Sequence, residues 1–298
     1  MIEQEQFIDV LTKVMKDAAQ KMSKSEVRLL VDGYYQIQEY RKATGNQITQ
    51  LIKQQVGDEK LKTWIDNDLK KIMAEIGSMG YATFDLILYI YENTERLEKN
   101  IRSILDKYSN ASHIGQWCRE ITGIGPVIAA GLLAHIEIEK APTAGHIWSF
   151  AGLDPDRKWE KGKKRPWNAS LKTLCWKIGE SFVKVSNNPK DVYGKLYQQR
   201  KALEDQRNDR LEFRSQAENK IEEIQRNKIS WNSFQQTVSY TDYYSQGKLP
   251  PAHIHARAKR YAVKIFLSHL HGEMYRDHYH CEPPVPFAVA ILGHAHVI

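Results

Sequence analysis

The chain has 298 residues, of which 42% are hydrophobic, so it can bury a core as one large domain or as two domains of ordinary size. Lys and Arg number 43 against 36 Asp and Glu, and the net charge of +7 permits a polyanionic partner without requiring one. Cys118, Cys175 and Cys281 lie far apart and form no CxxC pair, which argues against a disulfide framework and favours a reducing, cytoplasmic setting.

Residues 3–108 have the apolar spacing of successive amphipathic helices, for example at Val27, Leu30, Val31 and Tyr34. The first 110 residues are therefore predicted to form a helical bundle or an extended helical arm. The N-terminal residues are amphipathic and contain acids, so we expect no signal peptide. No window approaches the apolar length that a membrane-spanning helix needs, so we expect no membrane partner.

The rest of the chain also favours helices, so the predicted fold class is all-α. Residues 193–228 interleave opposite charges with few apolar positions, which is typical of one long solvated helix or of a coiled-coil strand, and the predicted fold includes this insertion as a long helical hairpin or a coiled coil. Together with residues 24–57, this segment could form a homodimer. We divide the chain into a helical arm (1–110), a central module (111–188), a helical insertion with an aromatic connector (189–250) and a closing helix with a tail (251–298).

Residues 121–136, ITGIGPVIAAGLLAHI, contain a two-glycine turn between two helical segments. Glycine can adopt positive φ, and Pro126 suits the first turn of the helix that follows. In such a helix-hairpin-helix, the N–H groups of Gly123, Ile124 and Gly125 would point outward beside a helix N-terminus and bind a phosphate. The alternative is a plain corner between two helices with no ligand.

A basic segment follows the turn. Residues 150–177 contain eight Lys and Arg but only three acids, and Trp159 and Trp167 are interleaved with them. Cations with aromatic side chains favour a nucleic-acid surface, on which the cations neutralise phosphates. The alternative is a solvated charged loop above buried tryptophans. The predicted contact residues are Arg157, Lys158, Lys161, Lys163, Lys164, Arg165, Lys172 and Lys177.

Four stretches in order, ITGIG, FAGLDP, KGKKR and SLKTLCWK, resemble the C-terminal domain of the Piv/MooV-type insertion-sequence transposases, which are guided by a bridge RNA. Residues 252–279 are similar to the closing helix of that domain. The resemblance implies a DNA-binding, helix-hairpin-helix transposase-like module, with residues 190–250 as an insertion. It also implies DNA, and structured RNA, as partners.

Two departures from the family concern its chemistry. Family members begin with an RNase H-like domain with four catalytic acids, whereas the first 110 residues here do not suggest a sheet, and Asp66 and Asp68 lie in an apparently helical segment. The family's nucleophilic serine lies between the two central motifs, where this chain has Trp159 and Glu160. Ser170 lies beyond that place and is interpreted as a helix cap.

The C-terminal quarter is rich in histidine, and imidazoles with a thiolate can bind zinc. Histidines two apart do not share a helix face, so His278, His280 and Cys281, in a looser segment, are the best candidates for a divalent metal. No metal or other cofactor is firmly predicted. No G-x-S-x-G or G-x-x-x-x-G-K-[ST] motif occurs, which argues against a serine hydrolase of that class and against a P-loop nucleotide site.

These observations predict a DNA-binding relative of insertion-sequence transposases that holds the phosphate backbone and is located in the cytoplasm or on the nucleoid. The alternative is an active transposase or a metal-dependent nuclease with divergent catalytic residues. Catalytic residues are not assigned.

Overall fold

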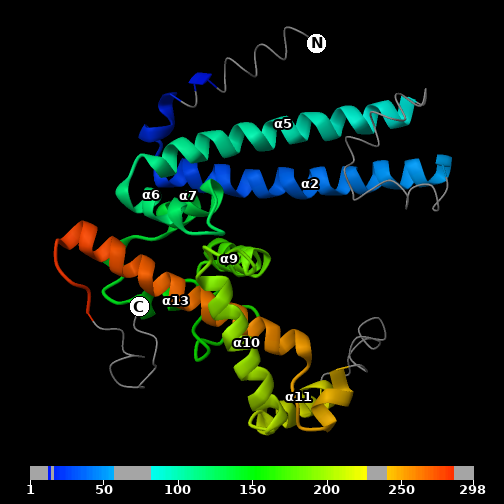
Figure 1. Ribbon diagram of the computed structural model, residues 1–298, viewed down its shortest axis with the longest axis vertical. Coiled ribbons are helices and arrows are strands. Elements are labelled where there is room, and N and C mark those ends of the chain that lie inside the picture. The colour runs from blue at the N-terminus through cyan, green and yellow to red at the C-terminus, as the bar shows by residue number, and fades with distance from the viewer. Residues whose placement is uncertain (1–12, 15–16, 57–81, 227–239, 285–298) are drawn as a thin grey trace. The chain divides into compact units, whose positions relative to one another are not determined.

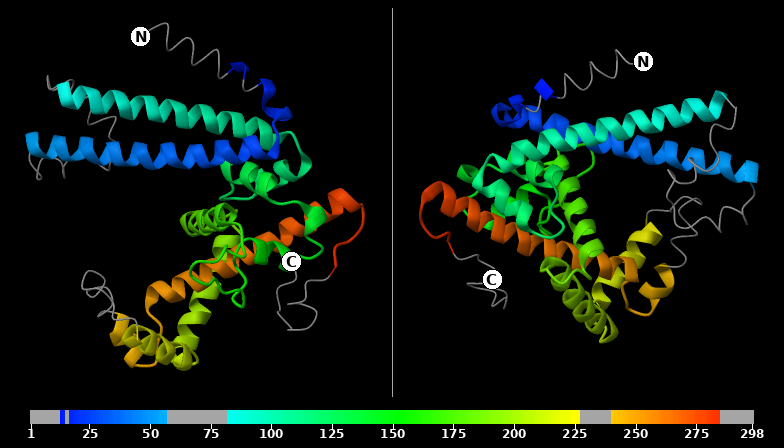
Figure 2. Two further views of the ribbon diagram at one scale, coloured as in Figure 1. Left: turned by 180° about the vertical axis from the view of Figure 1, so that it is seen from behind. Right: turned by 45° about the horizontal axis from the view of Figure 1, so that its top comes forward.

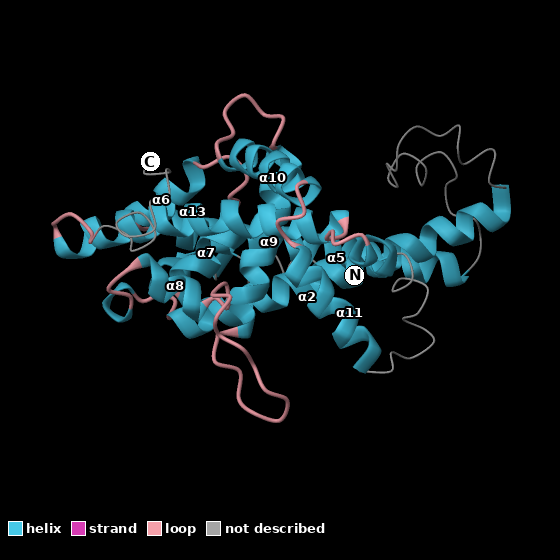
Figure 3. Ribbon diagram, turned by 90° about the horizontal axis from the view of Figure 1, so that it is seen from below, coloured by secondary structure: helices cyan, strands magenta, loops and turns pink. Residues whose placement is uncertain are grey.

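Helices form the regular structure of the part of the chain that the computed structural model describes, which is residues 13–14, 17–56, 82–226 and 240–284. No strand occurs in these ranges, as Figure 3 shows, so the all-α prediction is confirmed. Asp66 and Asp68 lie outside the described residues. No helix of the described ranges is both long enough and apolar enough to cross a membrane. Contacts divide the chain into two units, residues 1–115 with 129–135 and residues 116–128 with 136–298.

Two long helices dominate the first unit. Helices α2 (Lys24–Val56) and α5 (Ala82–Asn110) lie side by side and run in opposite directions (Figure 1). Helix α2 begins with a capping box, in which the Ser23 hydroxyl accepts from the Glu26 N–H at 3.3 Å and the Glu26 carboxylate accepts from the Ser23 N–H at 2.7 Å. The short 3₁₀ helix η1 (Ala19–Lys21) packs on α5.

The interface between α2 and α5 combines apolar burial with one polar cluster. Val27, Ile48 and Ile52 of α2 and Phe84 and Leu105 of α5 are almost completely buried. Between them, the Glu98 carboxylate accepts hydrogen bonds from Arg41 at 2.6 Å, Gln38 at 3.0 Å and Tyr34 at 3.1 Å. This cluster satisfies the polar groups that the helix pair encloses, so it favours one register of the two helices over others.

Helix α13 (Pro251–Tyr279) is the central element of the second unit. It packs against α8 (Ala144–Phe150), α9 (Ala169–Val185), α10 (Tyr193–Asp209) and the 3₁₀ helix η2 (Ile138–Lys140), and Figure 2 shows it from two further sides. The rings of Phe182, Tyr193 and Phe266 meet in the core, with centroids 4.9 to 5.6 Å apart. These aromatic contacts join α9, α10 and α13, and they fix the exposed faces of α9 and α13 relative to each other.

The prediction of one continuous helix over residues 193–228 is wrong. Helix α10 ends at Asp209, and α11 (Arg214–Arg226) begins after a turn in which Leu211 has φ of 60°. The turn carries Phe213, which is 2% exposed, and the guanidinium carbons of Arg207 and Arg257 lie 4.9 and 4.4 Å from the centroid of its ring. Burial of this phenylalanine against α10 and α13 therefore accompanies the break in the helix. Dimerisation through the long helices stays a prediction.

Candidate nucleic-acid interface

The two-glycine turn lies between helices α6 (His113–Glu120) and α7 (Pro126–His135). Gly123 has φ of 96°, a value that side chains rarely allow, and a Cβ added there would lie 3.2 Å from both Phe182 and Val185 of α9. The Gly123 carbonyl also accepts a hydrogen bond from Ser181 at 2.5 Å. One side of the turn is thus packed against the C-terminal part of α9, which holds the turn in place.

The three N–H groups predicted to bind a phosphate differ in their surroundings. The Ile124 N–H donates to the Ile121 carbonyl at 3.0 Å, and the Ile124 side chain is 3% exposed, so this amide is already occupied by the protein. The N–H groups of Gly123 and Gly125 have no protein acceptor in the described ranges. A Cβ added at Gly125 would meet nothing within 4 Å, so the backbone there faces open space.

Gly125 directly precedes the N-terminus of α7. Proline at the first position of this helix has no N–H, and the amides of Val127 and Ile128 lie in the first turn, where a helix offers no carbonyl to accept from them. No acidic residue occupies that turn to offset the positive end of the helix dipole. Pro126, Val127 and Ile128 are themselves buried, so the place that an anion can reach is the backbone of Gly125, directly before α7, rather than all three residues of the turn.

The predicted basic segment forms a loop between α8 and α9. The base of the loop is closed by backbone hydrogen bonds from Asn168 to Phe150 and from Leu153 to Trp148, each 2.8 Å long. The Asn168 side chain accepts from the Leu171 N–H at 2.9 Å and caps α9. The prediction that Ser170 caps this helix is wrong, because α9 begins at Ala169 and includes it.

The tip of the loop is held by its own side chains. Trp159 donates through Nε1 to the Lys163 carbonyl at 2.6 Å, and Arg157 donates to the Pro166 carbonyl at 3.2 Å. Glu160 pairs with the Lys163 ammonium at 2.7 Å. The two residues at the position of the family's nucleophilic serine, Trp159 and Glu160, thus both contribute to the conformation of the loop.

All six cations predicted on this loop are exposed. Lys163 pairs with Glu160, and the guanidinium carbon of Arg165 lies 5.6 Å from the centroid of the Trp159 ring. In contrast, Lys158, Lys161 and Lys164 make no ion pair within the described ranges. Three ammonium groups are therefore available to anions on a loop that is closed at its base and braced at its tip.

The last long helix adds cations that the sequence prediction missed. Partial burial lowers the pKa of Lys172 on α9, and the nearby charges of Arg165 and Arg260 lower it further. Burial also lowers the pKa of Lys264, whereas the carboxylates of Asp154 and Asp156 favour its charged form. Arg260 and Lys264 belong to α13, some 90 positions after Lys172 in the chain, so it is the packing of α13 on α8 and α9 that brings them to the loop.

The turn and the basic loop lie at different ends of α9. The turn contacts residues 181–185 of this helix, and the loop joins it at Asn168. From Asn168 to Phe182 is 14 residues, so at a rise of about 1.5 Å per residue the two points of attachment lie about 21 Å apart along α9. The predicted site is therefore two separate patches on one unit rather than a single pocket.

The turn and the basic loop lie within a stretch that is similar to a known transposase family. Residues 115–170 match the Transposase IS116/IS110/IS902 family. The match begins in α6, includes the two-glycine turn, α7 and the whole basic loop, and ends at the start of α9. No curated protein and no solved structure matches the chain.

The matched transposase-like stretch thus contains most of the residues predicted from the sequence to contact nucleic acid, with Lys172 and Lys177 just beyond its end. It supports a relation to insertion-sequence transposases over a minor part of the chain. It does not extend to the long helices of the first unit or to α13. The role of bridge RNA, which the sequence resemblance implies, is not tested by this match.

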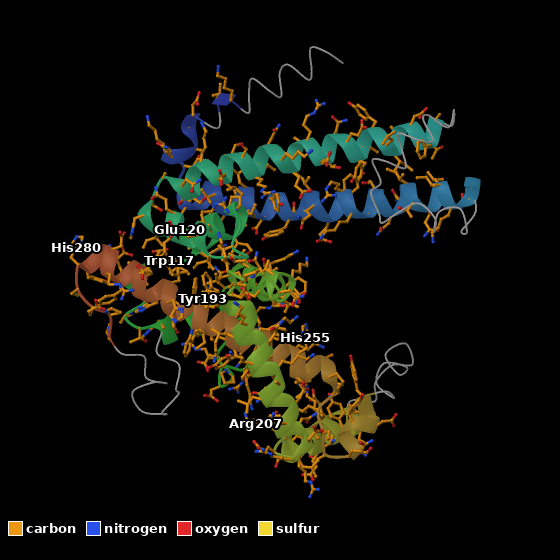
Figure 4. The ribbon with its side chains drawn as sticks, in the orientation of Figure 1. Trp117, Glu120, Tyr193, Arg207, His255 and His280 are labelled. Carbon is orange, nitrogen blue, oxygen red and sulfur yellow. The ribbon has the colours of Figure 1, made fainter. Side chains whose placement is uncertain are left out.

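The histidines of α13 have roles within the fold. Nδ1 of His255 forms a hydrogen bond with the Tyr197 hydroxyl of α10, and Nδ1 of His269 forms one with the Tyr193 hydroxyl, each 2.7 Å long. The buried His271 donates from Nε2 to the Ala141 carbonyl at 2.9 Å. Figure 4 shows His255 and His280 toward opposite ends of the helix. Among the described residues, which include His278, His280 and Cys281, no group of three His, Cys, Asp or Glu could hold a metal ion.

Proposed function

We propose that this chain is a DNA-binding protein, related to insertion-sequence transposases, that holds the phosphate backbone at two places. One place is the basic loop between α8 and α9, and the other is the backbone of Gly125, directly before α7. The observation that carries the proposal is the group of exposed ammonium groups without ion pairs, Lys158, Lys161 and Lys164, on a loop braced by its own hydrogen bonds.

The length of α9 between the two places is compatible with backbone binding. About 21 Å along the helix is less than one turn of duplex DNA, which is about 34 Å long. A duplex of one turn is therefore long enough to reach from one end of α9 to the other. Lysine ammonium groups and backbone amides contact phosphates without reading base edges, so we expect affinity with little sequence preference.

Salt dependence tests the contribution of the loop. In the triple variant Lys158→Gln, Lys161→Gln and Lys164→Gln, the plot of log K against log [salt] for a duplex is expected to become shallower by about 2.7, because each phosphate contact contributes about 0.9 to the slope. Fluorescence anisotropy with a labelled 20-base-pair duplex, between about 50 and 200 mM salt, measures this slope.

A matched variant controls for the change in net charge. Lys21, Lys24 and Lys99 are exposed residues of the first unit, and their replacement by glutamine removes the same charge as the loop variant. The control is expected to keep the wild-type slope to within about 0.5. Equal slopes for the two triple variants would show that the loop makes no special contribution, and a wild-type chain that binds no DNA at low salt would overturn the proposal.

The glycine turn is tested by a charge at its open side. Since a Cβ at Gly125 would meet nothing within 4 Å and the two side chains have the same shape, Gly125→Gln and Gly125→Glu should fold alike. We expect Gly125→Glu to bind duplex about 10-fold more weakly than Gly125→Gln, because a carboxylate there repels a phosphate at the helix N-terminus by about 1.4 kcal/mol. The same anisotropy titration measures the difference, and identical affinities would remove the turn from the interface.

Catalysis is tested separately, by cleavage or strand joining of plasmid DNA. An active recombinase or metal-dependent nuclease would nick or join supercoiled plasmid in Mg²⁺, Mn²⁺ or Zn²⁺. Structured RNA as an additional ligand is tested by adding a folded RNA to the same titration. The binding experiments above do not depend on either result.

A further inference from the structure

Trp176 is unusual among the large apolar side chains of the second unit. It lies on α9, whose residues Leu171, Leu174 and Ile178 face the core, and it is 56% exposed. An exposed indole of this size leaves much apolar surface in water, which is unfavourable unless another surface covers it. Its surroundings indicate what kind of surface that is.

Two cationic side chains flank the indole. The ammonium nitrogen of Lys177 lies 5.6 Å from the ring centroid of Trp176, and that of Lys259, from α13, lies 5.9 Å from it. Lys259 is held in position by an ion pair with Glu180 of α9. The ring is thus bordered by positive charge contributed by two helices that pack on each other.

The same face of α9 continues toward the basic loop. Lys172 lies four residues before Trp176 and therefore on the same side of the helix. Its ammonium nitrogen lies 4.1 Å from the ring centroid of Trp167, at the end of the loop. Partial burial and, to a smaller extent, the like charges of Arg165 and Arg260 lower the pKa of Lys172, and an anion bound there would favour its charged form.

A flat apolar ring beside several cations matches the chemistry of an unpaired nucleotide. The base stacks on the indole, and the adjoining phosphates meet the ammonium groups. A base pair within a duplex cannot do this, because its faces are covered by neighbouring pairs. A purely apolar protein partner would bury the ring and remove water from the nearby ammonium groups without offering them an anion, at a cost in free energy.

We infer that Trp176, with Lys172, Lys177 and Lys259, forms a stacking platform for an unpaired nucleotide. This inference rests on the proposed function, because it specifies which part of the nucleic acid the second unit contacts in addition to duplex phosphates. Bound DNA would then include a single-stranded or locally opened segment at α9, while the loop and the turn hold the backbone.

The test compares three labelled ligands by fluorescence anisotropy: a 12-nucleotide single strand, the same strand with abasic sites in place of its bases, and the 12-base-pair duplex. Stacking of one base contributes enough that Trp176→Ala should weaken binding of the single strand about 10-fold. Binding of the abasic strand and of the duplex should change less than about 2-fold, because neither offers a base to the ring.

Two further variants separate stacking from general effects. Trp176→Phe keeps an aromatic ring and should recover most of the affinity for the single strand. Tyr40→Ala removes a ring that is 53% exposed in the first unit and should leave all three affinities unchanged. Circular dichroism melting of each variant verifies that the fold is retained.

The outcomes distinguish this inference from the proposed function. An equal loss on all three ligands, or no loss on the single strand, overturns the platform, while salt-dependent duplex binding by the wild type keeps the proposed function. A wild-type chain that binds none of the ligands removes both. The single-strand titration is repeated with RNA of the same sequence. If Trp176→Ala weakens binding of only the DNA strand or only the RNA strand, that strand is the nucleic acid that the platform binds.

Discussion

Replacement of Glu204 by glutamine is expected to lower the free energy of unfolding by about 3 kcal/mol, the lower end of the range for a broken buried pair, because it leaves three half-buried arginines without their counter-charge. The Glu204 side chain is 1% exposed and pairs with Arg257 of α13 at 2.7 Å. It also pairs with Arg200 and, at 3.5 Å, with Arg207 of its own helix. The carboxylate thus joins α10 to α13, the helix that carries Arg260 and Lys264.

Urea unfolding followed by circular dichroism measures this loss. The control is Glu223→Gln, since Glu223 forms an exposed pair with Lys220 and its removal should change the free energy of unfolding by less than about 1 kcal/mol. Similar losses in the two variants would mean that the buried cluster contributes no more than a surface pair does.

The same carboxylate predicts a dependence on pH. Burial alone would raise the pKa of Glu204, but hydrogen bonds and charges from Arg257 and Arg200 outweigh it and hold the pKa below its ordinary value. A group whose pKa is lowered by folding stabilises the protein above its unfolded-state pKa, and this contribution is lost as the pH falls. In the wild type, the loss begins below about pH 4.3, and it should be reduced in Glu204→Gln.

Replacement of Gly115 by alanine is expected to destabilise the first unit by about 3 kcal/mol or more. A Cβ at this position would overlap the carbonyl oxygen of Ser109 and lie 2.7 Å from its carbonyl carbon. Both atoms belong to the backbone at the end of α5, so a change of side-chain rotamer cannot relieve the collision. The corner between α5 and α6 would have to open.

Gly33→Ala is the matched control in the same unit. Gly33 lies within α2, and a Cβ added there meets nothing within 4 Å. Because glycine inside a helix is unfavourable relative to alanine, this variant should be more stable than the wild type by about 0.5 to 1 kcal/mol. Thermal unfolding of both variants gives the comparison, and a Gly115→Ala protein as stable as Gly33→Ala would contradict the close packing described here.

The helical class and the position of the two-glycine turn could be predicted from the sequence, since both depend on local spacing and on the special properties of glycine and proline. The break after Asp209 could not. It depends on Leu211 at positive φ and on Phe213 packed between Arg207 and Arg257, and the second arginine lies on a helix far along the chain. Charge alternation continues through this turn, so the pattern alone indicates one helix.

The candidate site, like the fold, could be predicted only where it depends on neighbouring residues in the sequence. The cations of the loop are close together in the sequence and therefore visible there, whereas Arg260 and Lys264 reach the loop, and Lys259 reaches Trp176, only through the packing of α13 on α8 and α9. The occupied amide of Ile124 depends on a local hydrogen bond to Ile121 that a glycine-rich pattern does not reveal. The basic sequence HARAKRYAVK of residues 255–264 was the signal that could have identified the α13 cations.

The central claim, that backbone amides at the glycine turn meet the phosphates of DNA, is tested most directly by NMR on ¹⁵N-glycine-labelled protein titrated with duplex. The cross-peaks of Gly125 and Gly33 are assigned through their alanine variants, which both positions have room for. We predict that the Gly125 amide shifts as duplex is added and returns at high salt, while the Gly33 amide does not move. If the duplex binds and the Gly125 amide stays where it is in the free protein, the claim is contradicted.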